Sequence, residues 1–265
     1  MEITAILCGL MFAAAAVFSM LGLGGGVLYT PIQLLFGIDF HVAAANSLFL
    51  IMTVSLSATL VFRKADRIDW PLAWALESIT ALGGLAGGLY SRMFSGAFLS
   101  YVFAAVVGLA AVFMIREFKR EPAGLPEKTG WFYWRRRFGG RDYRVNMASA
   151  LPVSFVAGAV SGLVGVGGGV LQIPLMVLAL GVPMDIAVGS SAFMIGLTAL
   201  AGFSGHLVSG HWDWKTSVIL AVAVFLGGRI GARKSVTLNK EKMKKTFGWF
   251  LVGIAALMAA QASLH

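Results

Sequence analysis

Two glycine-rich stretches interrupt apolar sequence and could bind an anion. Residues 22–31 read GLGGGVLYTP, and residues 165–174 read GVGGGVLQIP. Glycine costs about 1 kcal/mol relative to alanine inside a helix, so clustered glycines predict that the helix unwinds there. Unwinding frees backbone N–H groups at the start of the next helix, where the helix dipole attracts negative charge. The candidate binding residues are Gly24, Gly25 and Gly26 in the first break and Gly167, Gly168 and Gly169 in the second.

Polar side chains near each break could donate hydrogen bonds to the same anion without burying a charge. These candidates are Tyr29, Asn46 and Ser47 in the first half of the chain and Gln172, Ser190 and Ser191 in the second. The alternative for both groups is structural. Small residues let membrane helices pack closely, and Ser and Asn cap helices or bond across them.

Two charged residues fall inside predicted apolar spans, where charges are rare and often functional. Glu77 is a candidate for proton coupling, and Arg229 is a candidate for contacting the anion. Neither has a charged counterpart in the other half, where Ala221 and Leu85 take their places. The alternative is that each side chain extends to the membrane interface, because each lies within about two helical turns of a predicted cytoplasmic end.

The sequence offers little for metal, redox or enzymatic chemistry. Cys8 is the lone cysteine, and it has no Cys or His neighbour at metal-ligand spacing. His41 and His206 also lack partners at such spacing, and we expect both at the membrane interface. A catalytic site needs a cluster of titratable or metal-binding groups, so we expect no enzyme, no metal and no cofactor.

The composition indicates a membrane protein with many spans. The chain has 265 residues, of which 58% are hydrophobic and 12% charged. Apolar runs of about 20 residues, long enough to cross the hydrocarbon core as helices, recur along the whole chain. The net charge of +9 is concentrated in a few short loops, a pattern typical of membrane topology rather than of nucleic-acid binding.

The two halves of the chain are related by duplication. The glycine breaks align with a shift of 143 residues, after which Ser47 aligns with Ser191 and Asp69 with Asp213 at a shift of 144. We therefore expect repeats at 1–115 and 146–265, joined by a basic linker at 116–145. The expected helices are at about 3–21, 26–37, 42–62, 71–90 and 97–115, and at about 147–164, 169–181, 185–208, 215–233 and 246–263. The short segments after the breaks would either span the membrane or form re-entrant hairpins.

The distribution of basic residues predicts that the repeats are inverted. Residues 116–144 carry nine basic and four acidic side chains, so this linker should be cytoplasmic. The loop at 63–70 contains Arg63, Lys64 and Arg67, whereas its counterpart at 207–214 contains no Lys or Arg. Corresponding loops thus face opposite sides, both termini should be extracytoplasmic, and the chain is an all-α membrane protein of two inverted repeats of about five helical segments, as in many secondary transporters.

The repeated G-x-G-G-G-x-x-x-x-P stretch, the A-A-N-S and V-G-S-S stretches and the later G-G-x-x-G run resemble the TauE/SafE family of sulfite and organosulfonate exporters. The resemblance covers nearly the whole membrane region. It implies a carrier in the bacterial inner membrane for a small sulfur-containing anion such as sulfite, sulfoacetate or a related sulfonate. It implies no nucleic-acid partner and leaves the oligomeric state open.

The favoured function is export of this anion by alternating access, with Glu77 as the candidate for proton coupling. Two alternatives stay open from the sequence. One is import of sulfite or thiosulfate by the same architecture, and the other is a passive anion channel.

Overall fold

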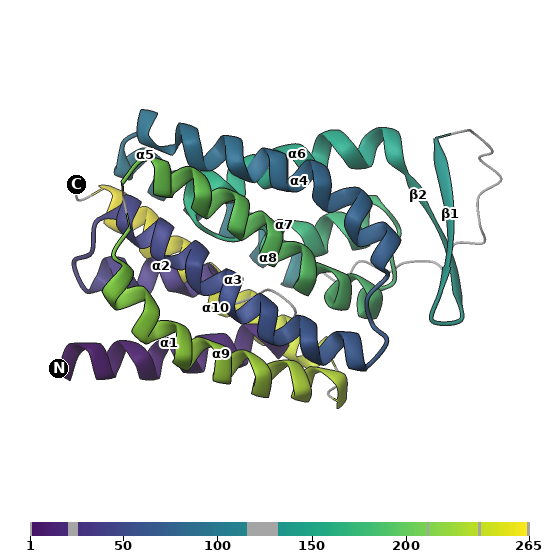
Figure 1. Cartoon of the computed structure of the whole chain (residues 1–265), viewed down its shortest axis with the longest axis horizontal. Coiled ribbons are helices and arrows are strands. Elements are labelled where there is room, and N and C mark those ends of the chain that lie inside the picture. The colour runs from purple at the N-terminus through teal and green to yellow at the C-terminus, as the bar shows by residue number, and fades with distance from the viewer. Residues whose placement is uncertain (1, 21–25, 116–131, 211, 238–239, 264–265) are drawn as a thin grey trace.

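The computed structural model describes residues 2–20, 26–115, 132–210, 212–237 and 240–263, most of which are helical (Figure 1). The first half contains α1 Glu2–Met20, α2 Gly26–Leu35, α3 Phe40–Lys64, α4 Trp70–Tyr90, the short 3₁₀ helix η1 Ser91–Met93, and α5 Gly96–Ile115. The second half contains α6 Met147–Val164, α7 Gly169–Pro174, the π-helical turn η2 Leu175–Ala179, α8 Met184–Val208, α9 Trp214–Thr237 and α10 Lys240–Ser263. Each helix predicted from the sequence is present in the structure.

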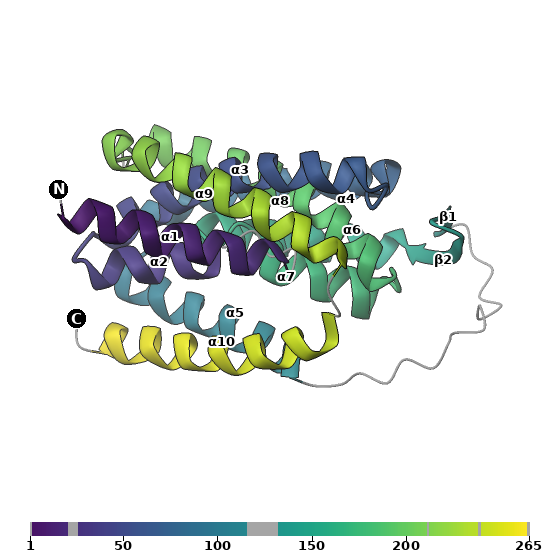
Figure 2. The same cartoon turned by 90° about the horizontal axis from the view of Figure 1, so that it is seen from below.

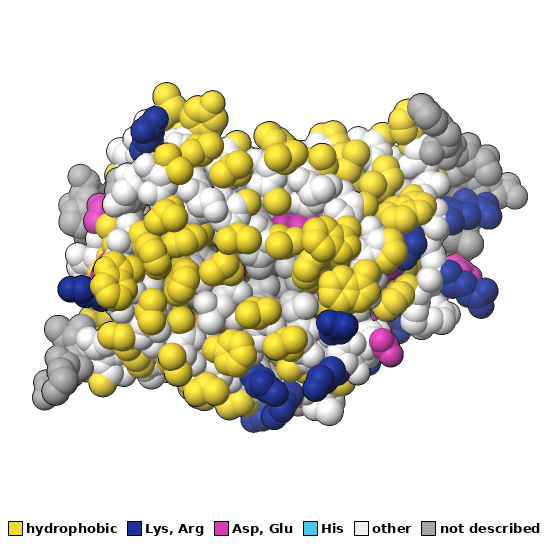
Figure 3. All heavy atoms as spheres, viewed as in Figure 1, with side chains coloured by type: hydrophobic (Ala, Val, Ile, Leu, Met, Phe, Trp, Pro, Cys, Tyr) yellow, Lys and Arg dark blue, Asp and Glu magenta, His cyan; other side chains and the backbone are white. Residues whose placement is uncertain are grey.

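Six of the described helical segments are long and apolar enough to cross a membrane: α3, α4 with η1, α5, α6, α8 and α9. Hydrophobic side chains cover much of the broad face of the molecule, and many Lys and Arg side chains lie toward the end that carries the β-hairpin (Figure 3). The chain is therefore a multi-pass membrane protein. At about 1.5 Å per residue, the 10 residues of α2 are too short to cross the hydrocarbon core alone.

Helix α4 packs against α6 through glycines on one of its faces. A Cβ added to Gly83 would overlap the carbonyl oxygen of Phe155, and one added to Gly87 would overlap that of Ala159. The two backbones approach this closely only because these positions lack side chains, as in other small-residue helix contacts in membranes.

Helix α9 packs against α1 in the same way. Gly227 lies against the carbonyl oxygen of Phe12, and Gly231 against that of Ala16. Phe12 and Ala16 are the counterparts of the two α6 residues at a shift of 143, and the α9 glycines are the counterparts of those in α4 at a shift of 144. The first helix of each half thus packs against the fourth helix of the other half, so the halves are interlocked rather than separate. Helices α5 and α10, which also correspond, pack against each other along one side (Figure 2).

The structure corrects the all-α expectation in the linker. Strands β1 Tyr133–Phe138 and β2 Arg141–Asn146 form an antiparallel hairpin. Gly139 and Gly140 form its turn, with φ of 59° and 73°. A two-residue turn of this kind requires positive φ at both positions, which glycine adopts without a steric cost. The rest of the predicted linker, residues 116–131, lies outside the described residues.

The segment after the second break also differs from the expected helix at 169–181. The α-helix α7 ends at Pro174 and continues as the π-helical turn η2. Proline lacks the N–H that would continue the regular ladder of helical hydrogen bonds. The corresponding segment of the first half, α2, contains Pro31 and stays α-helical to Leu35.

Candidate functional site

The start of α2 meets the second glycine break in the interior. In the second break, Gly165, Gly167 and Gly168 all adopt left-handed backbone conformations, with φ of 74°, 75° and 74°. Such angles favour glycine, so the sequence GVGGG ends α6 and allows a new helix to begin. A Cβ added to Gly26, the first residue of α2, would overlap the carbonyl oxygen of Val166. Gly24 and Gly25 lie outside the described residues, and Gly169 is the first residue of α7.

A buried polar cluster lies beside the second break and consists of Glu77, Gln172 and Thr198, which we call the Glu77 cluster. The Thr198 hydroxyl donates to Oε1 of Glu77 at 2.7 Å, and Nε2 of Gln172 lies 3.3 Å from Oε2 of Glu77 and 3.2 Å from Oγ1 of Thr198. Glu77 is 1% exposed, so the expectation that it extends to the membrane interface is wrong. The three residues come from α4, α7 and α8, and the sequence did not predict that they meet.

The place related to the Glu77 cluster by the duplication is mostly apolar. The counterparts of Glu77, Gln172 and Thr198 are Ala221, Tyr29 and Val54, which pack together within one hydrophobic core. The Tyr29 hydroxyl is buried and has no hydrogen-bond partner among the described residues. The two related places therefore differ in chemistry, and a buried carboxyl group is found at one of them.

Asn46 holds the start of α9 in place. Its Nδ2 donates to Oε1 of Gln33 at 2.9 Å, and its Oδ1 accepts from the Ser217 hydroxyl at 2.9 Å and from the Asp213 backbone N–H at 3.3 Å. Ser47 accepts from Thr30 at 2.9 Å. Both polar atoms of the Asn46 side chain are therefore already hydrogen-bonded to other parts of the protein.

Ser190 makes the corresponding bond in the other half. Its Oγ accepts from the backbone N–H of Asp69 at 3.0 Å, at the start of α4. Ser191 donates to the carbonyl oxygen of Val188 in its own helix at 3.1 Å. The starts of α4 and α9 lie at opposite ends of the bundle (Figure 1), so the structure does not bring the pair at 46–47 and the pair at 190–191 into one site.

The remaining candidates are placed apart from the breaks. Arg229 is exposed on α9. His206 is fully buried in the last turn of α8, with Nε2 3.0 Å from the carbonyl oxygen of Gly162 and Nδ1 3.5 Å from the Ser91 hydroxyl. His41 lies near the start of α3 and is partly buried. Among the described residues, no group of three His, Cys, Asp or Glu side chains could hold a metal ion.

Acidic residues at the starts of α4 and α8 anchor the hairpin. Asp69 is fully buried and bonds to Arg136, with Nε at 3.2 Å from Oδ2, and also accepts from the Tyr143 hydroxyl. Asp185 pairs with Arg141 of the hairpin at 3.0 Å and with Arg67 at 3.2 Å. Burial raises the pKa of the Tyr143 phenol, and its bond to Asp69 raises this pKa further, so the phenol stays protonated as a donor.

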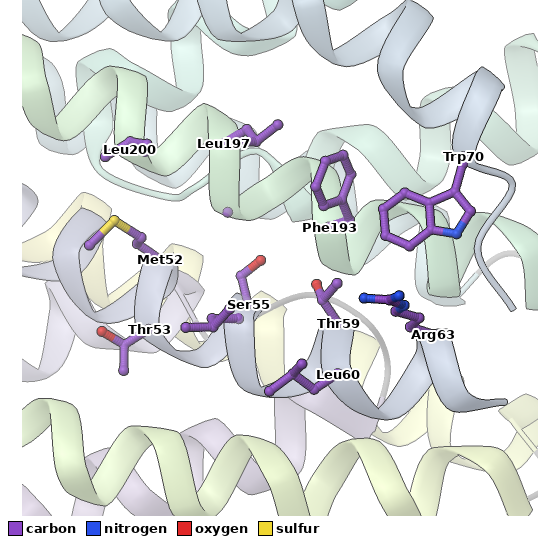
Figure 4. Close-up of a pocket in the computed structure, with 12 residues that line it drawn as sticks. Met52, Thr53, Ser55, Thr59, Leu60, Arg63, Trp70, Phe193, Leu197 and Leu200 are labelled. Carbon is purple, nitrogen blue, oxygen red and sulfur yellow. The ribbon is translucent and has the colours of Figure 1, made fainter. Parts of the chain in front are cut away.

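A crevice of about 440 Å³ lies between α3 and α8 (Figure 4). Its residues are mostly apolar, and Arg63, Trp70 and Phe193 lie together at one end of it. Arg63 is in the last turn of α3, near the hairpin. The Thr59 hydroxyl oxygen on the crevice wall is buried and has no hydrogen-bond partner among the described residues. The crevice therefore joins an apolar surface to a cationic end.

Aromatic rings close the opposite end of the seam between α3 and α8. The ring centroids of Phe49 and Phe203 are 5.6 Å apart, and the Trp212 ring lies 5.5 Å from Phe49 and 5.1 Å from Phe203. Phe49 is the counterpart of Phe193, which contacts Trp70 at the crevice end. Close aromatic contacts thus lie at both ends of the seam.

Comparisons with known proteins agree on one family. The family model described as "Sulfite exporter TauE/SafE" matches residues 7–258. The "Probable membrane transporter protein YunE" of Bacillus subtilis is 28% identical over 266 residues, which cover 97% of this chain and 96% of that protein. A "Probable membrane transporter protein" of Xylella fastidiosa is 23% identical over 240 residues, which cover 89% and 87% of the two chains.

A plant protein is similar over a shorter stretch. The "Sulfite exporter TauE/SafE family protein 5" of Arabidopsis thaliana is 32% identical over 79 residues, which cover 30% of this chain and 17% of that protein. No solved structure matches the chain significantly. Because the family model spans almost the entire bundle described above, the chain belongs to the sulfite exporter TauE/SafE family.

Proposed function

We propose that this protein is a secondary transporter that exports a small sulfur-containing anion, an organosulfonate such as sulfoacetate or sulfite, across the bacterial inner membrane. The observation that carries the proposal is the contact of the start of α2 with the second break, where Gly26 lies against the backbone of Val166. Irregular backbone at membrane depth is tolerated where it is enclosed by protein or lines a cavity, and transporters bind their substrates at such places. Membership of the family supports a transporter, and the choice of a sulfur anion follows its name.

Alternating access is supported by the directions of corresponding helices. In Figure 1, α3 begins at the end of the bundle where α1 begins and α10 ends, whereas α8 begins at the end that carries the hairpin. Opposite directions for corresponding helices are expected of inverted repeats, in which one half rocks against the other. On this proposal the basic hairpin end is cytoplasmic and both termini are extracytoplasmic.

The anion site that we propose lies at the start of α2 and the facing second break. Helix α2 begins at Gly26, so its first N–H groups and its dipole favour an oxyanion there. Tyr29 and Gln172 are the buried side chains nearest in sequence to the two breaks among our candidates. Asn46, Ser47, Ser190 and Ser191 contribute by fixing the helices around the site, because their hydrogen bonds join them to the protein itself.

The crevice between α3 and α8 supports a state that is accessible from the cytoplasmic side. One end of it carries Arg63, whose charge would concentrate anions, and the three aromatic rings at 49, 203 and 212 pack at the other end of the seam. We propose that the two ends of this seam open and close in turn during transport.

The test is a flux assay with purified protein in liposomes. We expect saturable uptake of radiolabelled sulfite or sulfoacetate and counterflow driven by unlabelled anion on the opposite side, with protein-free vesicles as the control. Flux no faster than in these vesicles for every sulfur anion tried would contradict the proposal. Saturation with counterflow distinguishes a carrier from a channel, which passes current without counterflow, and the effect of an imposed gradient distinguishes export from import.

A further inference from the structure

We infer that the Glu77 cluster binds a single Na⁺ ion, which couples the proposed transport to the sodium gradient. The inference rests on the proposed transport function and specifies its coupling ion. It begins from the carboxyl group of Glu77, which is 1% exposed in the middle of the bundle. The ion pairs of the described residues involve Asp69, Asp142 and Asp185, so none of them neutralises Glu77.

An uncompensated carboxylate in a low-dielectric interior is costly, so it requires either a proton or a bound cation. Both oxygens of Glu77 lie within reach of hydrogen-bond donors. Oε1 accepts from Thr198 at 2.7 Å, and Oε2 lies 3.3 Å from Nε2 of Gln172. One carboxylate carries one negative charge, which a monovalent cation balances and a divalent cation would exceed.

Unused oxygen atoms around the cluster provide an independent indication of a ligand. Oε1 of Gln172 is buried and has no hydrogen-bond partner among the described residues, although the side chain is only 1% exposed. Oγ of Ser161, also 1% exposed, is in the same situation. A Cβ placed on Gly168 would lie 3.5 Å from Oγ of Ser161 and 3.3 Å from Nε2 of Gln172, so both side chains flank the second break.

These atoms form a set that suits a hard cation. Carboxylate, hydroxyl and amide oxygens are the ligands that such cations prefer, and interrupted helices in transporters supply backbone carbonyls to Na⁺. In the structure Nε2 of Gln172 lies 3.3 and 3.2 Å from Glu77 and Thr198, which leaves Oε1 of the same amide available to a cation.

The duplication strengthens the inference by contrast. The duplication places Ala221, Tyr29 and Val54 at the positions related to the Glu77 cluster and Phe18 at the position related to Ser161. Three of these four counterparts are apolar, so packing at the related place does not require polar side chains at those three positions.

The experiment measures Na⁺ binding without any sulfur anion, so that it is independent of transport. Purified protein in detergent is heated in increasing NaCl, with choline chloride holding the ionic strength constant at fixed pH. We expect the melting temperature to rise with the logarithm of the Na⁺ concentration, because the ion binds the folded state. Radioactive Na⁺ binding to the wild-type protein provides a second readout.

Three variants locate the site. Glu77→Gln should abolish the Na⁺-dependent rise in melting temperature, and Thr198→Val should raise the Na⁺ concentration for its half-maximal effect by about tenfold or more, as for weakened metal sites. Thr80→Val is the matched control, because the Thr80 hydroxyl is equally buried on α4 but bonds to the backbone of Leu76 at 2.8 Å. It should keep the wild-type response. If Glu77→Gln does not fold, the site is tested by comparing the Na⁺ dependence of the melting temperature of Thr198→Val with that of Thr80→Val.

Three outcomes would overturn the inference: a melting temperature that is independent of Na⁺, an equal Na⁺ effect in Thr198→Val and the control, or a response to pH with none to Na⁺. The last would assign a proton to Glu77. In each case, sulfite flux in liposomes that remains in Na⁺-free buffer would leave the proposed transport function standing. Absence of flux together with specific Na⁺ binding would instead contradict the proposed transport function and leave the Na⁺ site standing.

Discussion

The backbone N–H of Asp69 donates a 3.0 Å hydrogen bond to the hydroxyl of Ser190, a residue 121 positions away in the chain. Its counterpart in the other half joins the N–H of Asp213 to Oδ1 of Asn46 at 3.3 Å. In both cases the third helix of one half fixes the start of the fourth helix of the other half. The same two fourth helices carry the glycines that pack on α6 and α1, so these bonds help to interlock the repeats.

We predict that Ser190→Ala lowers the free energy of unfolding by about 1–3 kcal/mol, because the buried N–H of Asp69 loses its acceptor. The measurement is thermal or denaturant unfolding in detergent. Ser204→Ala is the control, since the Ser204 hydroxyl bonds to the carbonyl oxygen of Leu200 in its own helix. Equal losses in the free energy of unfolding would show that the hydrogen bond between the halves stabilises the fold no more than one within a single helix.

The hairpin should depend on Arg136 and not on its neighbour Arg137. Arg136 pairs with the fully buried Asp69, so Arg136→Met leaves a buried charge and should cost about 3 kcal/mol. Arg137 pairs with Asp142 at 3.8 Å, and these side chains are 83% and 61% exposed, so Arg137→Met should cost less than about 1 kcal/mol. Unfolding and limited proteolysis of the hairpin measure the difference. Similar proteolysis of both variants would contradict the anchoring role of Asp69.

The glycines of α4 should be needed for packing. A Cβ at Gly87 would overlap the carbonyl oxygen of Ala159. Because that backbone atom cannot move without shifting the helix, Gly87→Ala should lower the free energy of unfolding by about 1–3 kcal/mol. Gly253 lies in α10 with nothing within 4 Å of its added Cβ. Gly253→Ala should therefore gain up to about 1 kcal/mol from helix propensity. A Gly87→Ala variant as stable as the wild-type protein would mean that α4 and α6 can move apart without loss of stability.

Transport should be sensitive to Gly168 for reasons beyond backbone strain. Gly168 and Gly37 have φ of 74° and 78°, so alanine at either position costs a similar left-handed strain of about 1–2 kcal/mol. Only the Cβ at Gly168 approaches the Gln172 amide and Ser161, whereas the Cβ at Gly37 meets nothing within 4 Å. We expect Gly168→Ala to lose most sulfite flux in liposomes while Gly37→Ala retains it. Parallel loss in both variants would assign the effect to strain alone.

Much of the fold could be predicted because its signals are local. Apolar runs of membrane-spanning length placed the helices, and Gly165, Gly167 and Gly168 marked a helix end because their positive φ values favour glycine. The hairpin was missed although Gly139 and Gly140 are a local turn signal. Its strands are basic and aromatic, and they are held by the pairing of Arg136 and Tyr143 with Asp69, a distant residue at the start of α4.

The candidate site was predicted only in part. Gly26 lies against the second break at Val166, and Gln172 lies beside Gly168, but their binding role stays a prediction. Arg229 was separated from them because it projects from the exposed face of α9. Thr198 was missed, because an isolated threonine in an apolar helix gives no signal until its neighbours are known.

The sequence by itself determined the family resemblance, the duplication, the helices and the positions where the backbone is interrupted. Each of these depends on residue type and spacing along the chain, and on the preference of apolar helices for lipid. Only the tertiary structure decided that Glu77 is buried and that Gln172, 95 positions away, bonds to it. The reason is that the cost of a buried charge depends on the groups around it, which the packing of three helices brings together and no local pattern specifies.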